Sequence, residues 1–189
     1  MKYADDEHFV GVIFTAQNPV PERVEACTFT NCDFRDADLR GRRFTECQFQ
    51  GCDLTNCKVT QSGWQDVRMI NCKAIGVLWE TCEPFLFALH VKDSRLDMGG
   101  WAGCDLSRST FKDCSMRESD FTGTVAAGTV FELVDLTASR FDGANLEGAS
   151  LLQTKGLELD PARNRVRGAQ VDRDALPGML LHWGLKFVN

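Results

Sequence analysis

The stretch CTFTNCDFRDADLRGRRFTECQFQGCDLTNC, residues 27–57, decides the fold because its residue types recur every five positions. Large apolar side chains occupy the central position of each unit, at Phe29, Phe34, Leu39, Phe44, Phe49 and Leu54. A small side chain, most often cysteine, stands two residues before each of them, and Arg42 is the exception. The other three positions of each unit are mostly charged or polar, so we expect them to face water.

The same period continues through most of the chain. One series of central residues runs from Phe29 to Trp79 and a second from Leu96 to Leu151, with a single alanine in each. A five-residue period matches neither a helical turn of 3.6 residues nor the two-residue alternation of a flat strand. We therefore expect each unit to form a short extended side followed by a corner. Four units would close a square coil of about twenty residues, and successive coils would stack as parallel strands.

The units CDFRD, ADLRG, CDLTN, CDLSR, ANLEG and SDFTG resemble the consensus A(D/N)LXX of the pentapeptide-repeat family. The resemblance covers at least residues 27–151 and implies an all-β solenoid, namely a right-handed quadrilateral parallel β-helix in which each coil contacts only its neighbours. We expect an N-terminal cap at residues 1–23 and the β-helix at 24–171, with a break at 80–95. A C-terminal helix and short strand at 172–189 would serve capping and dimerisation.

The break appears as a shift in phase, because Leu96 follows Trp79 by 17 residues, two more than a multiple of five. The segment after Trp79 contains Pro84, which cannot donate a hydrogen bond to a strand ladder. It also carries the apolar residues Phe85, Leu86, Phe87 and Leu89. Two interpretations stay open: a bulge that packs these side chains against the solenoid, or a loop that contacts a partner.

The C-terminal residues have a helical pattern. Asp174 is a suitable N-cap, Pro177 falls in the first turn, and Gly184 is a suitable C-terminal stop. The apolar stripe of this helix would cover the last coil, and we also expect it to join two copies end to end, because a solenoid end is an unpaired apolar surface. The expected dimer-interface residues are Leu176, Met179, Leu180, Trp183, Leu185 and Phe187.

The nine cysteines follow the same five-residue spacing. Every gap between successive cysteines is a multiple of five, except a gap of 22 residues that spans the phase shift. No C-x-x-C spacing supports a zinc site. We expect nine thiols that act as small buried spacers, with no metal and no cofactor.

Composition and motifs argue against an enzyme, a nucleic-acid-binding protein and a membrane-binding protein. His8, His90 and His182 lie far apart in sequence, and none accompanies a Ser, Cys or Asp in a catalytic pattern, so we expect no enzyme activity and no catalytic residue. The net charge of −6 disfavours direct binding to nucleic acid or to an anionic membrane. The N-terminus lacks the features of a secretory signal, and no apolar run of 18 residues occurs, so we expect a cytoplasmic protein.

The size, the single central break, the LDPARNRVRGA turn and the apolar helix ending in WGLKFV resemble the topoisomerase-protecting branch of the family. That branch includes Qnr-type quinolone-resistance proteins, the albicidin-resistance protein and a microcin immunity protein. The resemblance implies a homodimeric rod that imitates duplex DNA and binds DNA gyrase or a related type II topoisomerase. It would inhibit the enzyme or protect it from an antibiotic or toxin, as a factor for antibiotic resistance or self-immunity.

The surface expected to contact the topoisomerase consists of outward carboxylates. These are Asp33, Asp36, Asp38, Glu46, Asp53, Asp97, Glu118, Asp120 and Asp135. The alternative function is a structural or scaffolding solenoid that mediates other protein–protein interactions.

Overall fold

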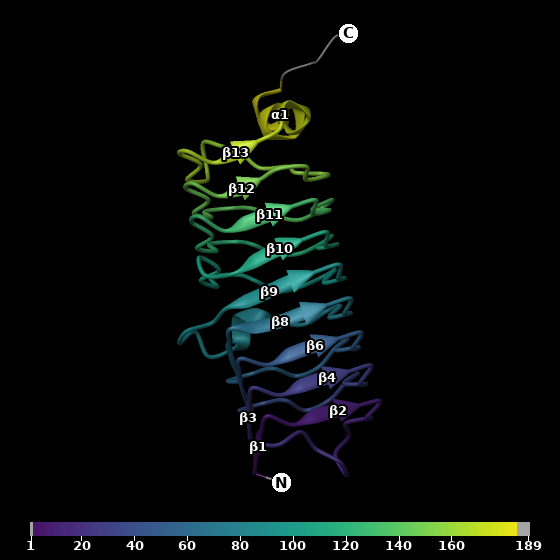
Figure 1. The fold of residues 1–189 in the computed structure, drawn as a ribbon. Coiled ribbons are helices and arrows are strands. Elements are labelled where there is room, and N and C mark those ends of the chain that lie inside the picture. The colour runs from purple at the N-terminus through teal and green to yellow at the C-terminus, as the bar shows by residue number, and fades with distance from the viewer. Residues whose placement is uncertain (1, 185–189) are drawn as a thin grey trace.

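The computed structural model describes residues 2–184. The chain winds into a parallel β-solenoid of about eight coils, which stack from the N-terminus to a short C-terminal helix (Figure 1). Residues about twenty positions apart pair in register along four columns, so each coil has four sides. The expected solenoid fold is confirmed.

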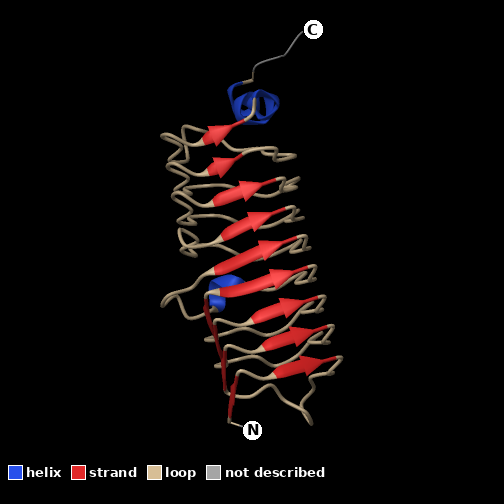
Figure 2. Ribbon diagram, viewed as in Figure 1, coloured by secondary structure: helices blue, strands red, loops and turns tan. Residues whose placement is uncertain are grey.

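Parallel sheets form two of these sides (Figure 2). The first side has four strands, in the order β1 (Tyr3–Asp5), β3 (Arg23–Glu25), β5 (Arg43–Thr45) and β7 (Gly63–Gln65). The second side has nine, in the spatial order β2 (His8–Val10), β4 (Thr28–Thr30), β6 (Gln48–Gln50), β8 (Val67–Ile70), β9 (Leu89–Lys92), β10 (Thr110–Lys112), β11 (Val130–Glu132), β12 (Ser150–Leu151) and β13 (Gln170–Val171). Isolated bridges hold the third side, such as Asp33 with Asp53, and the fourth side, such as Asp120 with Arg140.

The interior follows the five-residue pattern. Every central residue of both series is at most 7% exposed, and the aromatic rings stack from coil to coil, as Phe29 does on Phe49 with ring centroids 4.7 Å apart. Many small residues also form hydrogen bonds to the preceding coil. Cys47 Sγ donates to the carbonyl of Val24 at 3.4 Å, and Thr124 Oγ1 donates to the carbonyl of Trp101 at 2.8 Å. The spacer position therefore suits cysteine, serine and threonine because it offers their polar atom a buried partner.

The N-terminal residues belong to the solenoid itself. β1 and β2 pair with β3 and β4 in the regular register, and Phe9 stacks on Phe29 with the ring centroids 4.9 Å apart. The region expected as a separate cap thus begins with a coil of the stack, because the apolar side chains of Ala4, Phe9 and Phe14 fall in the same phase as the later repeats.

The phase shift corresponds to one coil that is two residues longer than its neighbours. Val67 of β8 pairs with Leu89 of β9, 22 residues later, whereas the neighbouring coils pair at 20. A 3-10 turn, η1 (Trp79–Thr81), leads into the loop at residues 82–88. This loop takes the place of the next strand of the first side, and its Ala88 N–H donates a hydrogen bond to the Trp64 carbonyl of β7. The first-side sheet therefore ends at β7, and regular stacking resumes at Leu89, so the insertion is narrower than the expected 80–95.

Arg42 causes no bulge in the backbone. Its N–H donates to the Leu39 carbonyl at 3.0 Å and its carbonyl accepts from Gly63 at 2.8 Å, as at the other repeats. The side chain is half-buried and lines depressions on the surface. The guanidinium reaches the surface from an inward position.

The C-terminal helical segment covers the last coil (Figure 1). It consists of η2 (Arg173–Ala175), α1 (Leu176–Leu180) and η3 (Leu181–Trp183), and it ends at Gly184, whose φ of 67° is left-handed. The predicted N-cap was wrong: Asp174 lies inside η2 and Ala175 precedes α1, because the chain enters the helix through a 3-10 turn. The expected short strand after Gly184 lies outside the described residues.

Candidate functional site

The expected acidic residues are distributed over several parts of the surface. Asp33, Asp53 and Asp135 lie on the third side, and Asp38 and Asp120 lie on the fourth. Asp36 and Glu118 occupy the corner between these two sides, and Glu46 the corner between the first and second. The third and fourth sides adjoin, so most of these carboxylates share one half of the circumference.

Arginines neutralise some of these carboxylates. Arg35 pairs with Asp33 at 2.5 Å, Arg40 with Asp38 at 2.6 Å, and Arg140 with Asp120 at 2.8 Å. The side-chain hydrogen bond from Arg40 lowers the pKa of Asp38 to about 2. The arginine of each pair is solvent-exposed, so the pairs add little stability.

The remaining carboxylates carry the net negative charge of this surface. Asp36, Glu46, Asp53, Glu118 and Asp135 have no ion-pair partner among residues 2–184. They are the carboxylates best able to meet a basic partner.

Asp97 does not belong to this surface, contrary to the sequence prediction. It is 4% exposed, because Arg95 and Arg117 cover it from two coils: Arg95 Nε donates to it at 2.7 Å, and Arg117 donates through its backbone N–H at 3.0 Å and Nη2 at 3.2 Å. Burial acts to raise the pKa of Asp97, but these bonds and one from Ser115 Oγ outweigh it and lower the pKa to about 2. Asp97 therefore joins coils together.

The four contact residues expected at the break fall into an exposed pair and a buried pair. Phe85 and Leu86 are 65% and 43% exposed, and they lie within the turn that the Phe87 N–H closes on the Pro84 carbonyl at 3.3 Å. The loop at the break projects from the stack (Figure 2). Phe87 and Leu89 are 5% and 0% exposed, which corrects their assignment as contacts. Phe87 packs edge-on against Trp79, and Leu89 starts β9 in an inward position. The packing interpretation thus holds for Phe87 and Leu89, while Phe85 and Leu86 remain candidate contacts.

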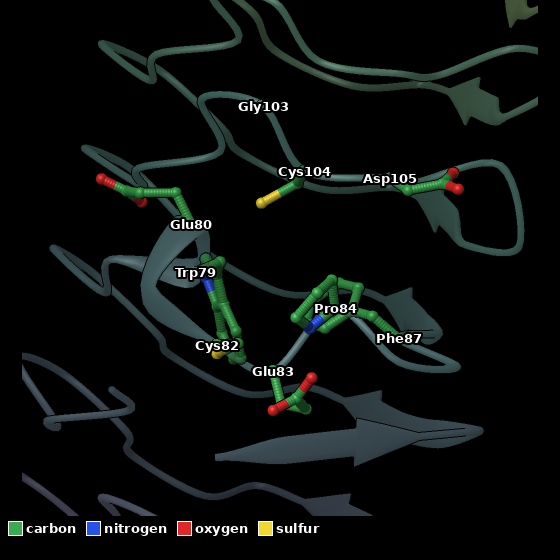
Figure 3. Close-up of a pocket in the computed structure, with 9 residues that line it drawn as sticks. All are labelled: Trp79, Glu80, Cys82, Glu83, Pro84, Phe87, Gly103, Cys104 and Asp105. Atoms are coloured by element: carbon green, nitrogen blue, oxygen red, sulfur yellow. The ribbon is translucent and has the colours of Figure 1, made fainter. Parts of the chain in front are cut away.

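A pocket of about 200 Å³ lies beside this loop, and the sequence reasoning missed it (Figure 3). It opens where the enlarged coil meets the next one, so the only signal in the sequence was the two-residue phase shift. Burial raises the pKa of Cys82 and of Cys104 to about 12, so both thiols stay protonated at neutral pH and are poor nucleophiles. The lining residues are Trp79, Glu80, Cys82, Glu83, Pro84, Phe87, Gly103, Cys104 and Asp105.

The C-terminal helical segment has a buried and an exposed face. Met179 is buried and Leu180 half-buried, while Leu176 is exposed. Leu181 and Trp183 are 51% and 59% exposed, and sequence reasoning missed Leu181 because η3 changes the helical spacing there. Leu185 and Phe187, the other expected interface residues, lie outside the described residues.

The repeats decide the family. The model of the pentapeptide repeats matches residues 25–61, 101–125 and 114–151, with eight copies. The chain is a pentapeptide-repeat protein. The matched stretches of this pentapeptide-repeat protein lie on both sides of the loop at 82–88, so the loop interrupts one solenoid.

No curated protein matches the chain. Among solved structures, a trypsin-treated form of QnrB1, a plasmid-mediated fluoroquinolone resistance protein, is 19% identical with a TM-score of 0.49, over 98% of this chain and 100% of QnrB1. HetL, involved in heterocyst differentiation regulation in the cyanobacterium Nostoc, is 16% identical with a TM-score of 0.40, over 88% of this chain and 81% of HetL. At these values neither match carries an argument about function.

None of the helices in the described part of the chain has the length and apolar character needed to cross a membrane.

Proposed function

We propose that this pentapeptide-repeat protein binds DNA gyrase or a related type II topoisomerase as a mimic of duplex DNA. Binding would inhibit the enzyme or protect it from an antibiotic or toxin, without catalysis by the chain itself. The observation that carries the proposal is the uninterrupted stack of nine strands on the second side, which spans about 38 Å at a strand spacing of about 4.8 Å. That length equals about eleven base pairs of DNA at about 3.4 Å each.

The charge pattern supports the same partner. A DNA-binding channel is basic, and long-range attraction to carboxylates steers an acidic rod into it. Asp36, Asp53, Glu118 and Asp135 provide that charge on the third side and its corner, and Glu46 does so on the opposite corner. Asp33, Asp38 and Asp120 contribute less, because each already faces an arginine.

The C-terminal end would join two copies into a longer rod. Leu176, Leu181 and Trp183 form an exposed apolar surface at the end of the stack, and a two-fold contact would cover it in both copies. An end-to-end dimer would measure about 76 Å, twice the single stack. Leu180, Leu185 and Phe187 remain part of the proposed interface, and we place the complex in the cytoplasm.

The loop tip would add a specific contact. Phe85 and Leu86 project beyond the regular surface, where an apolar side chain can enter a pocket of a partner. The buried Phe87 holds the base of the loop against Trp79. The loop would therefore lose less conformational entropy when it binds a partner.

A gyrase supercoiling assay, with and without a gyrase poison, tests the proposal. We expect micromolar protein to reduce supercoiling or to reduce poison-stabilised DNA cleavage. The ion-paired carboxylates favour a second candidate, a scaffold for a less basic partner. Absence of inhibition, protection and gyrase binding would reject the first function and leave the scaffold.

A further inference from the structure

Three arginines without ion-pair partners meet at one corner of the first coils. Eight of the fourteen arginines of the chain pair with a carboxylate. Arg23, Arg42 and Arg43 have no such partner among residues 2–184. Arg23 of β3 and Arg43 of β5 are direct neighbours in register, and Arg42 precedes Arg43 at the corner between the fourth and first sides. Three guanidinium groups without a carboxylate partner therefore share one corner of a protein whose net charge is −6.

The corner encloses an open depression of about 420 Å³, lined by Glu22, Arg23, Arg40, Gly41, Arg42 and Arg43. Gly41 has a φ of 67° and no atom within 4 Å of where its Cβ would be, so the corner stays open. Arg43 extends along Gly63, with Nη1 3.4 Å from the ideal Cβ position of that glycine, so the missing side chain gives the guanidinium room.

The arrangement has an energetic cost that folding alone does not explain. Arg42 stands where the other repeats carry a small side chain such as cysteine, serine, threonine or valine. Its Nε is buried without a hydrogen-bond partner among the described residues. A buried donor without an acceptor is destabilising, and so are like charges directly opposite each other on neighbouring strands, such as Arg23 and Arg43. The local carboxylates relieve little of this charge, because Asp38 pairs with Arg40, and neither Glu22 nor Glu25 forms an ion pair within residues 2–184.

We infer that this corner, formed by Arg23, Arg42 and Arg43, is a binding site for a phosphate dianion. A guanidinium presents a planar fork of donors that matches two phosphate oxygens, and an anion between the arginines would remove their mutual repulsion. The arginines occupy only two coils, about 4.8 Å apart, and carboxylates surround them. The site therefore suits one phosphate group, free or carried by a small molecule or a phosphorylated side chain, and not a nucleic acid backbone. It does not depend on topoisomerase binding.

Calorimetric titration of the full chain with inorganic phosphate, at constant ionic strength in chloride, tests this site. The double variant Arg23→Gln/Arg43→Gln should bind phosphate at least about tenfold more weakly, because it loses two charged donors. The matched control is Arg108→Gln/Arg167→Gln, which removes two exposed arginines that also have no ion-pair partner among residues 2–184; its affinity should change less than about twofold. All four positions are exposed, so an unchanged circular dichroism spectrum should accompany both variants.

Two further arms identify the source of the phosphate and guard against non-specific attraction. Tighter binding of phosphoserine than of inorganic phosphate would assign a phosphorylated ligand, and equal binding a free phosphate; either result supports the site. Arg23→Lys/Arg43→Lys keeps the charge but loses the fork, so part of the affinity should disappear. Equal weakening in the Gln variant and its control, or no phosphate binding by the unmodified protein, would overturn the inference. Salt-sensitive binding of a short DNA duplex at this corner, tighter than that of phosphate, would also overturn it.

Discussion

Asp97 shows how a single charged residue joins neighbouring coils. Its carboxylate accepts hydrogen bonds from Arg95 on its own coil and from Ser115 and Arg117 on the next. Because these bonds outweigh burial and lower the pKa to about 2, the ionised carboxylate stabilises the fold. That stabilisation is present above the unfolded pKa of 3.8 and is lost as the pH falls toward 2.

We predict that Asp97→Asn lowers the free energy of unfolding at neutral pH by about 2 kcal/mol, the value that corresponds to this pKa difference. The variant should also lose part of the acid sensitivity between pH 4 and pH 2. Urea unfolding at several pH values measures both effects. Asp36→Asn is the control, because Asp36 is exposed and has no ion-pair partner in the described part of the chain. This variant should change stability by less than about 0.5 kcal/mol. Equal stability of the two variants would contradict the role of Asp97.

The buried thiols predict an alkaline limit to stability. Burial raises the pKa of Cys47 to about 12 and that of Cys114 to about 11, above the unfolded value of 9.0. The unfolded chain therefore loses thiol protons from about pH 9 while the folded chain keeps them, so stability falls as the pH rises toward 12. Cys47→Ser should reduce this fall by about 1.4 kcal/mol per pH unit above pH 9, as measured by urea unfolding at pH 8 and pH 10. An identical pH dependence in both proteins would contradict the assignment.

At the scale of elements, the loop at the break separates a structural residue from candidate contact residues. We predict that Phe85→Ala/Leu86→Ala keeps the free energy of unfolding within about 0.5 kcal/mol but weakens topoisomerase binding. Phe87→Ala should instead cost about 3 kcal/mol, because that ring is buried against Trp79. Chemical unfolding and gyrase affinity, measured for both variants, separate the roles. A strongly destabilised Phe85→Ala/Leu86→Ala protein would contradict the exposed tip.

The sequence predicted the repeating elements well and the irregular ones poorly, for a physical reason. A central residue such as Phe111 has the same environment as the equivalent residues of the coils before and after it. Its large apolar side chain is therefore enough to predict that it points into the core. Phe85 and Phe87 are the same residue type inside an insertion, and only the path of residues 82–88 decides which one is buried. The position of Asp97 is likewise settled by Arg117, twenty residues later, and not by its own repeat. The arginine corner was missed because it depends on Arg23, which belongs to another unit and is brought beside Arg43 only by the stacking of the coils.

At the scale of the whole molecule, the exposed apolar end predicts a dimer. Leu181→Glu/Trp183→Glu should convert the protein to a monomer, because two charges would be buried at the contact. Sedimentation equilibrium measures the mass. Leu133→Glu is the control, since Leu133 is also exposed but lies on the shaft of the stack, and this variant should remain dimeric. A folded, unmodified protein that is already monomeric would contradict the end-to-end contact.

The most direct test of DNA mimicry is competition between the protein and a linear DNA duplex for gyrase. Fluorescence anisotropy of labelled duplex bound to gyrase can follow the displacement as the protein is added. We predict that the protein displaces the duplex, and that raising the duplex concentration shifts the displacement curve in proportion, as for two ligands that share one channel. Simultaneous binding of protein and duplex to gyrase, or no displacement at any protein concentration, would contradict the proposed mimicry.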